Sequence, residues 1–254
     1  LNPATPGFGE FCSRLDRKPR TFGTPDADFP LELNRAAGAV DAVQTFRVCG
    51  EEYAFELPGE HNVINASGAI AVALDLGLSP EAIRRGLALC RLPPGRLNVE
   101  VVSEVLFVDD SYNANPCSME AAFGTFADLC GEAVEGRNIA VLGEMRELGE
   151  GSQRYHEELG RRLAGFDMNI LVTIGGDSRH LSEAFVQELQ DLGRAEETTT
   201  VHFEDLSTAK GYLAAEIKPG DRVLFKASNA VGLSGLAGEL RETAREAQRE
   251  TPFV

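Results

Sequence analysis

From residue 97 onward, short apolar stretches alternate with longer amphipathic ones, and this alternation limits the possible folds more than any other feature of the chain. Short apolar runs between turn residues are typical of buried strands, whereas apolar residues recurring every three to four positions are typical of helices. Strands are predicted at 97–102, 105–108, 138–142, 170–174, 199–203 and 222–225, and helices at 116–129, 153–163, 182–192, 206–217 and 233–248. Buried strands separated by helices predict an α/β fold with a mainly parallel, doubly wound sheet.

The first 92 residues follow a less regular pattern. Short strands are predicted at 45–48 and 53–57, followed by an apolar helix at 62–76. A second helix begins at Ser79-Pro80-Glu81, which supplies a cap, a proline at the first helical position and an acidic first turn. Both helices are so apolar that we expect each to be buried on more than one side. Two prolines and a glycine at 93–95 cannot continue a helix, so we predict two domains, 1–92 and 93–254.

Composition and charge exclude several classes of protein. The formal net charge of -16, without a stripe of lysines and arginines, argues against a nucleic-acid partner. No apolar run reaches the roughly 18 residues of a membrane span. The first residues have neither the basic start nor the apolar core of a secretory signal, so we expect a cytoplasmic protein without membrane insertion. The five cysteines are widely spaced, which predicts reduced structural thiols and no metal site.

The predicted sheet brings four polar loops, at 109–115, 143–151, 175–178 and 226–230, to the carboxyl ends of its strands. Ligands of doubly wound sheets bind at these ends, near the point where strand order reverses. The most informative loop reads Asp-Asp-Ser-Tyr-Asn-Ala-Asn-Pro over 109–116. A carboxylate beside a helix N-terminus suits the two hydroxyls of a ribose. The alternative is that Asp110 or Asn115 merely caps the helix, and turn chemistry alone explains any one of these loops equally well.

The string at 109–116 also resembles the signature of the Mur ligase family, specifically of its MurF type, the UDP-N-acetylmuramoyl-tripeptide:D-alanyl-D-alanine ligases. Three further stretches agree with family motifs in order and spacing. They are the helix-opening motif at 57–66, the interdomain arginine motif Pro-Gly-Arg-Leu at 94–97, and the loop Val-Leu-Gly-Glu-Met-Arg-Glu-Leu-Gly at 141–149. Four motifs spread over most of the chain are more specific than any one of them.

The resemblance implies that residues 1–92 are the later part of a central ATPase domain and that residues 93–254 are a Rossmann-like C-terminal domain. No Gly-Lys-Thr or Gly-Lys-Ser phosphate loop occurs in the sequence, and the UDP-sugar domain is not expected in it. The implied cofactors are ATP and Mg²⁺, with most of their ligands outside these residues. The implied substrates are a UDP-MurNAc-peptide, activated as an acyl phosphate, and D-Ala-D-Ala, whose amine attacks it. A monomer is favoured.

Four residues match the nucleotide-binding positions of the family. Asn62 and Asn65 match residues near the adenine, and their spacing of three places them on one helical face. Arg96 matches an arginine that reaches the nucleotide across the domain cleft and is also a catalytic candidate, since a planar guanidinium suits phosphate. The alternative for Arg96 is a salt bridge at the rim. Asp110 matches the carboxylate that binds ribose.

The remaining candidates match the acceptor side. Tyr112, Asn113 and Asn115 match the loop that lines it, Ser228 matches a substrate-binding position, and Lys226 matches a catalytic one. The same segment contains a departure, because Asn229 stands where the family usually has arginine.

Two other interpretations stay open. The chain could be a non-catalytic nucleotide-binding or regulatory homologue, or an ordinary Rossmann dehydrogenase or transferase. The lack of a Gly-x-Gly-x-x-Gly motif after a strand disfavours the latter. For these 254 residues alone we expect weak or absent ATP binding and no turnover.

Overall fold

The computed structural model describes residues 1–34, 43–131 and 136–250, which divide into two compact units, Leu1–Arg91 and Leu92–Val254. The division lies beside the Pro-Pro-Gly sequence at 93–95. The assignment of the two units to particular family domains stays a prediction.

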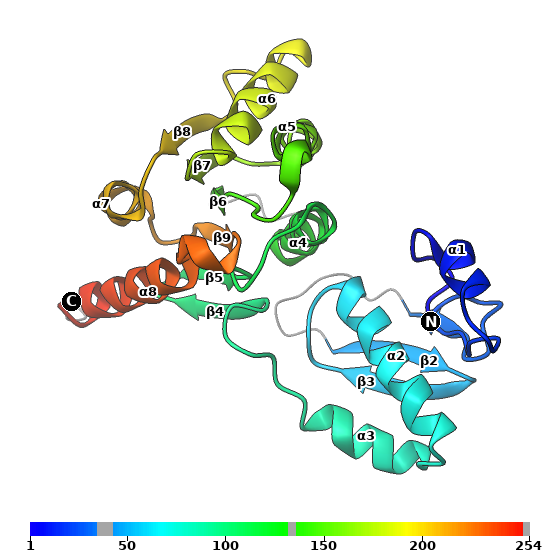
Figure 1. Cartoon of the computed structure of the whole chain (residues 1–254). Helices are drawn as coiled ribbons and strands as arrows, with labels where there is room; N and C mark the ends of the chain where they lie inside the picture. Colours follow the sequence, from blue (N-terminus) through cyan, green and yellow to red (C-terminus); the bar gives the residue numbers. More distant parts are fainter. Residues whose placement is uncertain (35–42, 132–135, 251–254) are drawn as a thin grey trace. The chain divides into compact units, whose positions relative to one another are not determined.

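The first unit pairs a small antiparallel sheet with helices (Figure 1). Its elements are α1 (Phe8–Ser13), β1 (Leu31–Leu33), β2 (Gln44–Val48), β3 (Glu51–Phe55), α2 (Glu60–Asp75) and α3 (Pro80–Ala88), with strand order β1-β2-β3. Phe46 and Tyr53 on the strands and Val63 and Ile70 on α2 belong to one buried cluster. The predicted strands and long helices are present, whereas α1 and β1 were not predicted.

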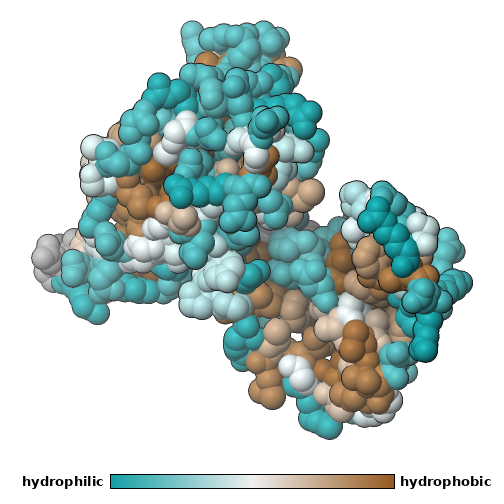
Figure 2. All heavy atoms as spheres, in the orientation of Figure 1, coloured by the Kyte–Doolittle hydropathy of each residue, from teal (hydrophilic) through white to brown (hydrophobic). Residues whose placement is uncertain are grey.

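The expectation that both long helices are buried on more than one side is wrong within this unit. Helix α2 buries five residues that follow one face, and α3 buries only Ile83. Val72 and Leu76 are 61% and 74% exposed, and Figure 2 shows apolar side chains at the surface of this unit. The prediction failed because a high apolar content was treated as all-round burial, although a core-facing helix needs only one apolar stripe.

The second unit is built around a six-stranded sheet with the order β4-β5-β9-β6-β7-β8. Strand β4 is antiparallel to β5, and the remaining pairs are parallel. The strands are β4 (Asn98–Val102), β5 (Val105–Asp109), β6 (Asn138–Gly143), β7 (Ile170–Ile174), β8 (Thr199–Phe203) and β9 (Arg222–Lys226). The helices are α4 (Pro116–Cys130), α5 (Ser152–Leu163), α6 (Ser178–Asp191), α7 (Leu206–Glu216) and α8 (Leu233–Glu250), with the short 3-10 helices η1 (Gly149–Gly151) and η2 (Asn229–Val231).

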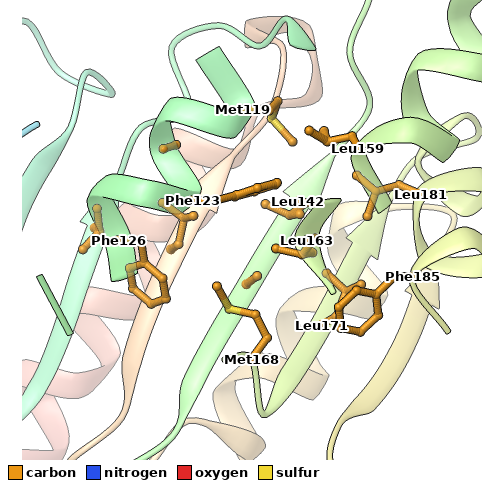
Figure 3. Close-up of a cluster of buried hydrophobic side chains, with 14 of the residues drawn as sticks. Met119, Phe123, Phe126, Leu142, Leu159, Leu163, Met168, Leu171, Leu181 and Phe185 are labelled. Carbon is orange, nitrogen blue, oxygen red and sulfur yellow. The ribbon is translucent and has the colours of Figure 1, made fainter. Parts of the chain in front are cut away.

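Helices cover both faces of this sheet, which confirms the predicted doubly wound α/β fold (Figure 1). Helices α4, α5 and α6 pack on one face, where aromatic and aliphatic side chains such as Phe123, Leu163 and Phe185 meet Leu142 and Leu171 from the strands (Figure 3). Helices α7 and α8 pack on the other face, over a second buried cluster. Buried strand residues on both sides explain why these strands read as continuous apolar runs.

The last strand, β9, lies between β5 and β6, so the connection from β5 through α4 to β6 passes over it. The chain continues outward to β7 and β8 before it returns to this central position. Strand order therefore reverses around β9, and the carboxyl ends of β5, β9 and β6 meet at one edge, as predicted for a ligand site. In the part of the chain that the structure describes, no helix combines the length and apolar character needed to cross a membrane.

Candidate functional site

Lys226, the last residue of β9, forms the centre of the site. Its Nζ lies 2.7 Å from Asp110 Oδ2, 3.2 Å from the Asp110 carbonyl oxygen and 3.0 Å from the Asn113 carbonyl oxygen. The side chain is only 2% exposed. An ammonium group has three N–H donors and no acceptor, so these three contacts satisfy it. The β9 lysine thereby fixes the loop that follows β5.

The loop after β5 is held from its other side by the segment that precedes β4. Asp110 Oδ1 accepts a hydrogen bond from the Leu97 backbone N–H at 3.1 Å, and the Tyr112 N–H donates to the Gly95 carbonyl at 2.7 Å. Gly95 has a φ of +71°, and a Cβ there would lie 3.0 Å from the Tyr112 nitrogen. Both the backbone conformation and the close approach require glycine at this position.

Arg96 is presented at the surface beside this loop. Its guanidinium carbon lies 4.1 Å from the centroid of the Tyr112 ring, which is a cation–π contact. Among the described residues of the second unit, no carboxylate pairs with Arg96, so the salt bridge considered from the sequence is not formed within this unit. A stacked guanidinium with open N–H groups suits an anionic group such as phosphate.

Asp109 differs from its neighbour Asp110 because successive strand residues point to opposite faces. It is 1% exposed and accepts hydrogen bonds from Ser111, through its N–H and its hydroxyl, and from the Ser234 hydroxyl at 3.2 Å. Arg241 of α8 lies 3.7 Å away. Asp109 thus anchors the loop to α8. The sequence analysis selected only Asp110 as a site residue. The alternation of side chains along a strand is the signal that separates the anchoring role of Asp109 from the ligand-facing position of Asp110.

The loop after β6 joins the site through Ser228. The Ser228 hydroxyl, buried in the protein, accepts a hydrogen bond from the Arg146 N–H at 2.9 Å, and the Ser228 N–H donates to the Glu144 carbonyl at 3.1 Å. Gly143 packs tightly here, since a Cβ on it would lie 2.6 Å from the Ala227 Cβ. Two of the predicted polar loops, 143–151 and 226–230, are therefore joined by hydrogen bonds.

His156 of α5 was missed by the sequence reasoning. Its Nε2 accepts a hydrogen bond from the Met145 N–H at 2.9 Å, so the proton is on Nδ1, which donates to the Ser152 carbonyl at 2.8 Å. Burial lowers the pKa of His156, which keeps the ring neutral and able to accept. Its position on the apolar face of α5 with Leu159 and Leu163 predicts that the ring is buried. That pattern does not predict its hydrogen bond to the loop after β6.

Two asparagines of the loop after β5 have local roles. Asn115 caps α4: its side chain accepts from the Ser118 N–H at 2.9 Å, and the Ser118 hydroxyl accepts from the Asn115 N–H. This is the capping alternative considered from the sequence. Asn113 is exposed, and its side-chain oxygen accepts from the Ala114 N–H. Any contact of Asn113, Asn115 or Tyr112 with a substrate stays a prediction.

Asn62 and Asn65 lie in the first turns of α2, in the first unit. The Asn62 side chain donates to the Pro58 carbonyl at 2.7 Å, while Asn65 is exposed. Their adenine contacts stay predictions. In the residues that the structure describes, no group of three or more His, Cys, Asp or Glu is placed to hold a metal ion.

The family model described as "Mur ligase, glutamate ligase domain" matches residues 95–229, which contain both the Lys226–Asp110 centre and the loop after β6. The chain belongs to the Mur ligase family. The match begins at Gly95, beside the division between the two units.

Two curated relatives of this Mur ligase chain share one name. The UDP-N-acetylmuramoyl-tripeptide--D-alanyl-D-alanine ligase of Mycobacterium tuberculosis is 39% identical over 196 residues, which cover 72% of this chain and 38% of that enzyme. The Escherichia coli enzyme of the same name is 36% identical over 129 residues, covering 50% of this chain and 27% of that enzyme. The chain thus spans well under half the length of the curated relatives it matches.

Solved Mur ligase structures share the fold. MurF from Acinetobacter baumannii matches with a TM-score of 0.70 at 29% identity, over 88% of this chain and 47% of that one. MurF from Thermotoga maritima, determined in complex with ADP, matches with a TM-score of 0.68 at 25% identity, over 90% of this chain and 49% of that one. These likenesses confirm both the α/β fold class and the resemblance to the MurF type.

Proposed function

We propose that this Mur ligase chain is part of an ATP-dependent enzyme that joins D-alanyl-D-alanine to the carboxyl group of a UDP-MurNAc-peptide in peptidoglycan precursor synthesis. Support comes from the name shared by the Mycobacterium tuberculosis and Escherichia coli relatives and from the ADP-bound structure of a similar protein. The observation that carries the proposal is the Lys226–Asp110 contact, which fixes a polar loop at the reversal point of the sheet and leaves Arg96 open beside it.

In this proposal the two units have different roles. We assign adenine contacts to Asn62 and Asn65 of the first unit, and nucleotide contacts to Arg96 and Asp110 of the second unit. When bound, ATP supplies the phosphoryl group that activates the peptide carboxylate for attack by the acceptor amine. The chain's own contribution is to orient the reacting groups and to exclude water, which are the main sources of rate in such positioning-dependent reactions.

Asp110 keeps the capacity that a ribose contact needs. A carboxylate has about four lone-pair sites, and the Leu97 N–H and Lys226 ammonium use one on each oxygen. Further sites can accept the two ribose hydroxyls. Lys226 has no such spare capacity, because its three donors are already used. We therefore assign Lys226 a positioning role, through Asp110 and Asn113, in place of direct contact with a reacting group.

The acceptor side is assigned to the loops after β5, β6 and β9. Tyr112 and Asn113 are exposed at this edge and are available to a ligand. Asn115 acts through the capped N-terminus of α4, where the helix dipole favours negative charge. Ser228 fixes the loop after β6 with its hydroxyl oxygen.

A thermal-shift titration of the 254-residue chain tests the proposal. D-Ala-D-Ala at ten times its Kd should stabilise the folded chain by about 1.4 kcal/mol, from RT ln(1 + [L]/Kd). For a unit of this size that is a rise of roughly 3–6 °C in Tm. NAD at the same concentration should cause no rise, and neither should L-Ala-L-Ala. A rise with NAD and none with D-Ala-D-Ala would overturn the proposal in favour of a dehydrogenase.

A further inference from the structure

The backbone of the loop after β6 is held at three successive residues by two neighbouring elements. The Glu144 carbonyl accepts from the Ser228 N–H at 3.1 Å, the Met145 N–H donates to His156 Nε2 at 2.9 Å, and the Arg146 N–H donates to Ser228 Oγ at 2.9 Å. Anchors from both α5 and the segment after β9 fix this part of the loop. Side chains at 144 and 146 are therefore presented in a defined direction.

The Arg146 guanidinium is oriented by Glu144 and remains open to a ligand. Its Nε and one terminal nitrogen each lie 2.7 Å from Glu144 Oε1, and the Arg146 side chain is 56% exposed while that of Glu144 is 19% exposed. Arginine has five N–H donors in a planar fork, and the contact with Glu144 occupies only one edge of it. The remaining donors match the two oxygens of a carboxylate.

Arg146 lies beside residues of the β9 loop that offer a ligand no positive charge. Lys226 is buried and has no donor left for a ligand, and Asn229, exposed beside Ser228, carries no charge. The Arg146 backbone contacts Ser228 directly. Building on the proposed function, we propose that Arg146 binds the carboxylate of the dipeptide acceptor.

The chemistry of the acceptor supports this assignment. The amine of a dipeptide must reach the activated carboxyl group, so its own carboxylate is the charged group left for recognition. A protein with a formal net charge of -16 repels an anion at long range. A local guanidinium that forms charge-assisted hydrogen bonds offsets this repulsion and selects a free carboxylate over an amide.

Isothermal titration calorimetry with D-Ala-D-Ala and with its C-terminal amide tests the proposal. The unmodified chain should bind the free acid about 10- to 100-fold more tightly than the amide. R146M should lose this preference, and R146K should keep part of it. R161M is the matched control, because Arg161 is 52% exposed and pairs with a glutamate in α5; it should bind like the unmodified chain.

The outcomes separate the two proposals. Equal binding of acid and amide by the unmodified chain, or an unchanged preference in R146M, overturns the role of Arg146 and leaves the proposed function standing. No binding of either ligand by the unmodified chain overturns both. Far-UV circular dichroism checks that R146M is folded, and R146K provides the measurement should R146M unfold.

Discussion

Replacing Lys226 by methionine tests whether the contact between β9 and the loop after β5 stabilises the protein. Methionine keeps a similar length and apolar stem but removes the ammonium group. The Asp110 carboxylate would then lose its partner 2.7 Å away, and two backbone carbonyls would lose their donor. The charge left behind would have little access to water, because the Lys226 and Asp110 side chains are only 2% and 18% exposed.

The expected loss follows from this burial. Removing one partner of a buried ion pair costs about 3–5 kcal/mol, because it leaves a charge without compensation. In a unit of this size each kcal/mol lowers Tm by roughly 2–4 °C, so K226M should melt about 6–20 °C lower. D110N/K226M removes both charges, and its loss should be smaller than the sum of the single losses by about 1–3 kcal/mol.

Urea unfolding followed by far-UV circular dichroism suits this double-mutant cycle, because the chain has no tryptophan and urea does not screen charge. The matched control is a cycle on Arg154 and Glu158, an exposed pair on α5. R154M/E158Q should be additive within about 0.5 kcal/mol. If K226M costs less than about 1 kcal/mol, or if its cycle with D110N is as additive as the control, the structural role given to Lys226 is wrong.

Two further predictions concern the loop after β6. Gly143→Ala should destabilise the second unit by about 1–3 kcal/mol, because the new methyl group would lie 2.6 Å from the Ala227 Cβ and 2.9 Å from Val231 Cγ1. A227G should relieve only part of the loss, because the contact with Val231 remains, and thermal melts of the single and double variants measure it. For His156, burial lowers the folded-state pKa, so as pH falls below the unfolded value of about 6.5 the unfolded chain binds the proton first and stability is lost. We therefore expect the unmodified chain to be more stable than H156Q by a larger margin at pH 7.5 than at pH 5, as measured by urea unfolding. A difference in stability that does not change with pH would contradict the buried neutral ring.

Most elements of the second unit were predictable because their signals are local and strong. Strands 138–142, 170–174 and 222–225 were predicted within a residue of β6, β7 and β9, since short runs of buried aliphatic residues have few alternatives. Helix α4 was predicted from Asn115 and Pro116, and the capping box is present. Helix α1 and strand β1, with six and three residues, are too short for any periodic signal.

The candidate site was predictable only in part. Placing Asp110 and Lys226 at carboxyl ends of parallel strands was enough to expect them at one edge, although 116 positions separate them. Their direct contact depends on β9 pairing with β5, and the sequence holds no local sign of that neighbour. The roles of His156 and Arg146 could not be predicted for the same reason. They depend on hydrogen bonds to Met145 and Ser228, and these contacts join separate loops and helices that no local sequence pattern brings together.

Because β9 is the last strand in sequence but lies in the middle of the sheet, the second unit cannot complete its sheet until nearly all of its residues have been synthesised. During synthesis, β5 and β6 emerge long before residues 222–226 and cannot be joined until that strand enters between them. Closing such long-range pairings is slow, and two unpaired strand edges stay open to wrong partners in the meantime. Lys226 is the last residue of β9, so its contact with Asp110 forms only after this strand has paired. The candidate ligand site of a nascent chain is therefore not ordered until the sheet is complete.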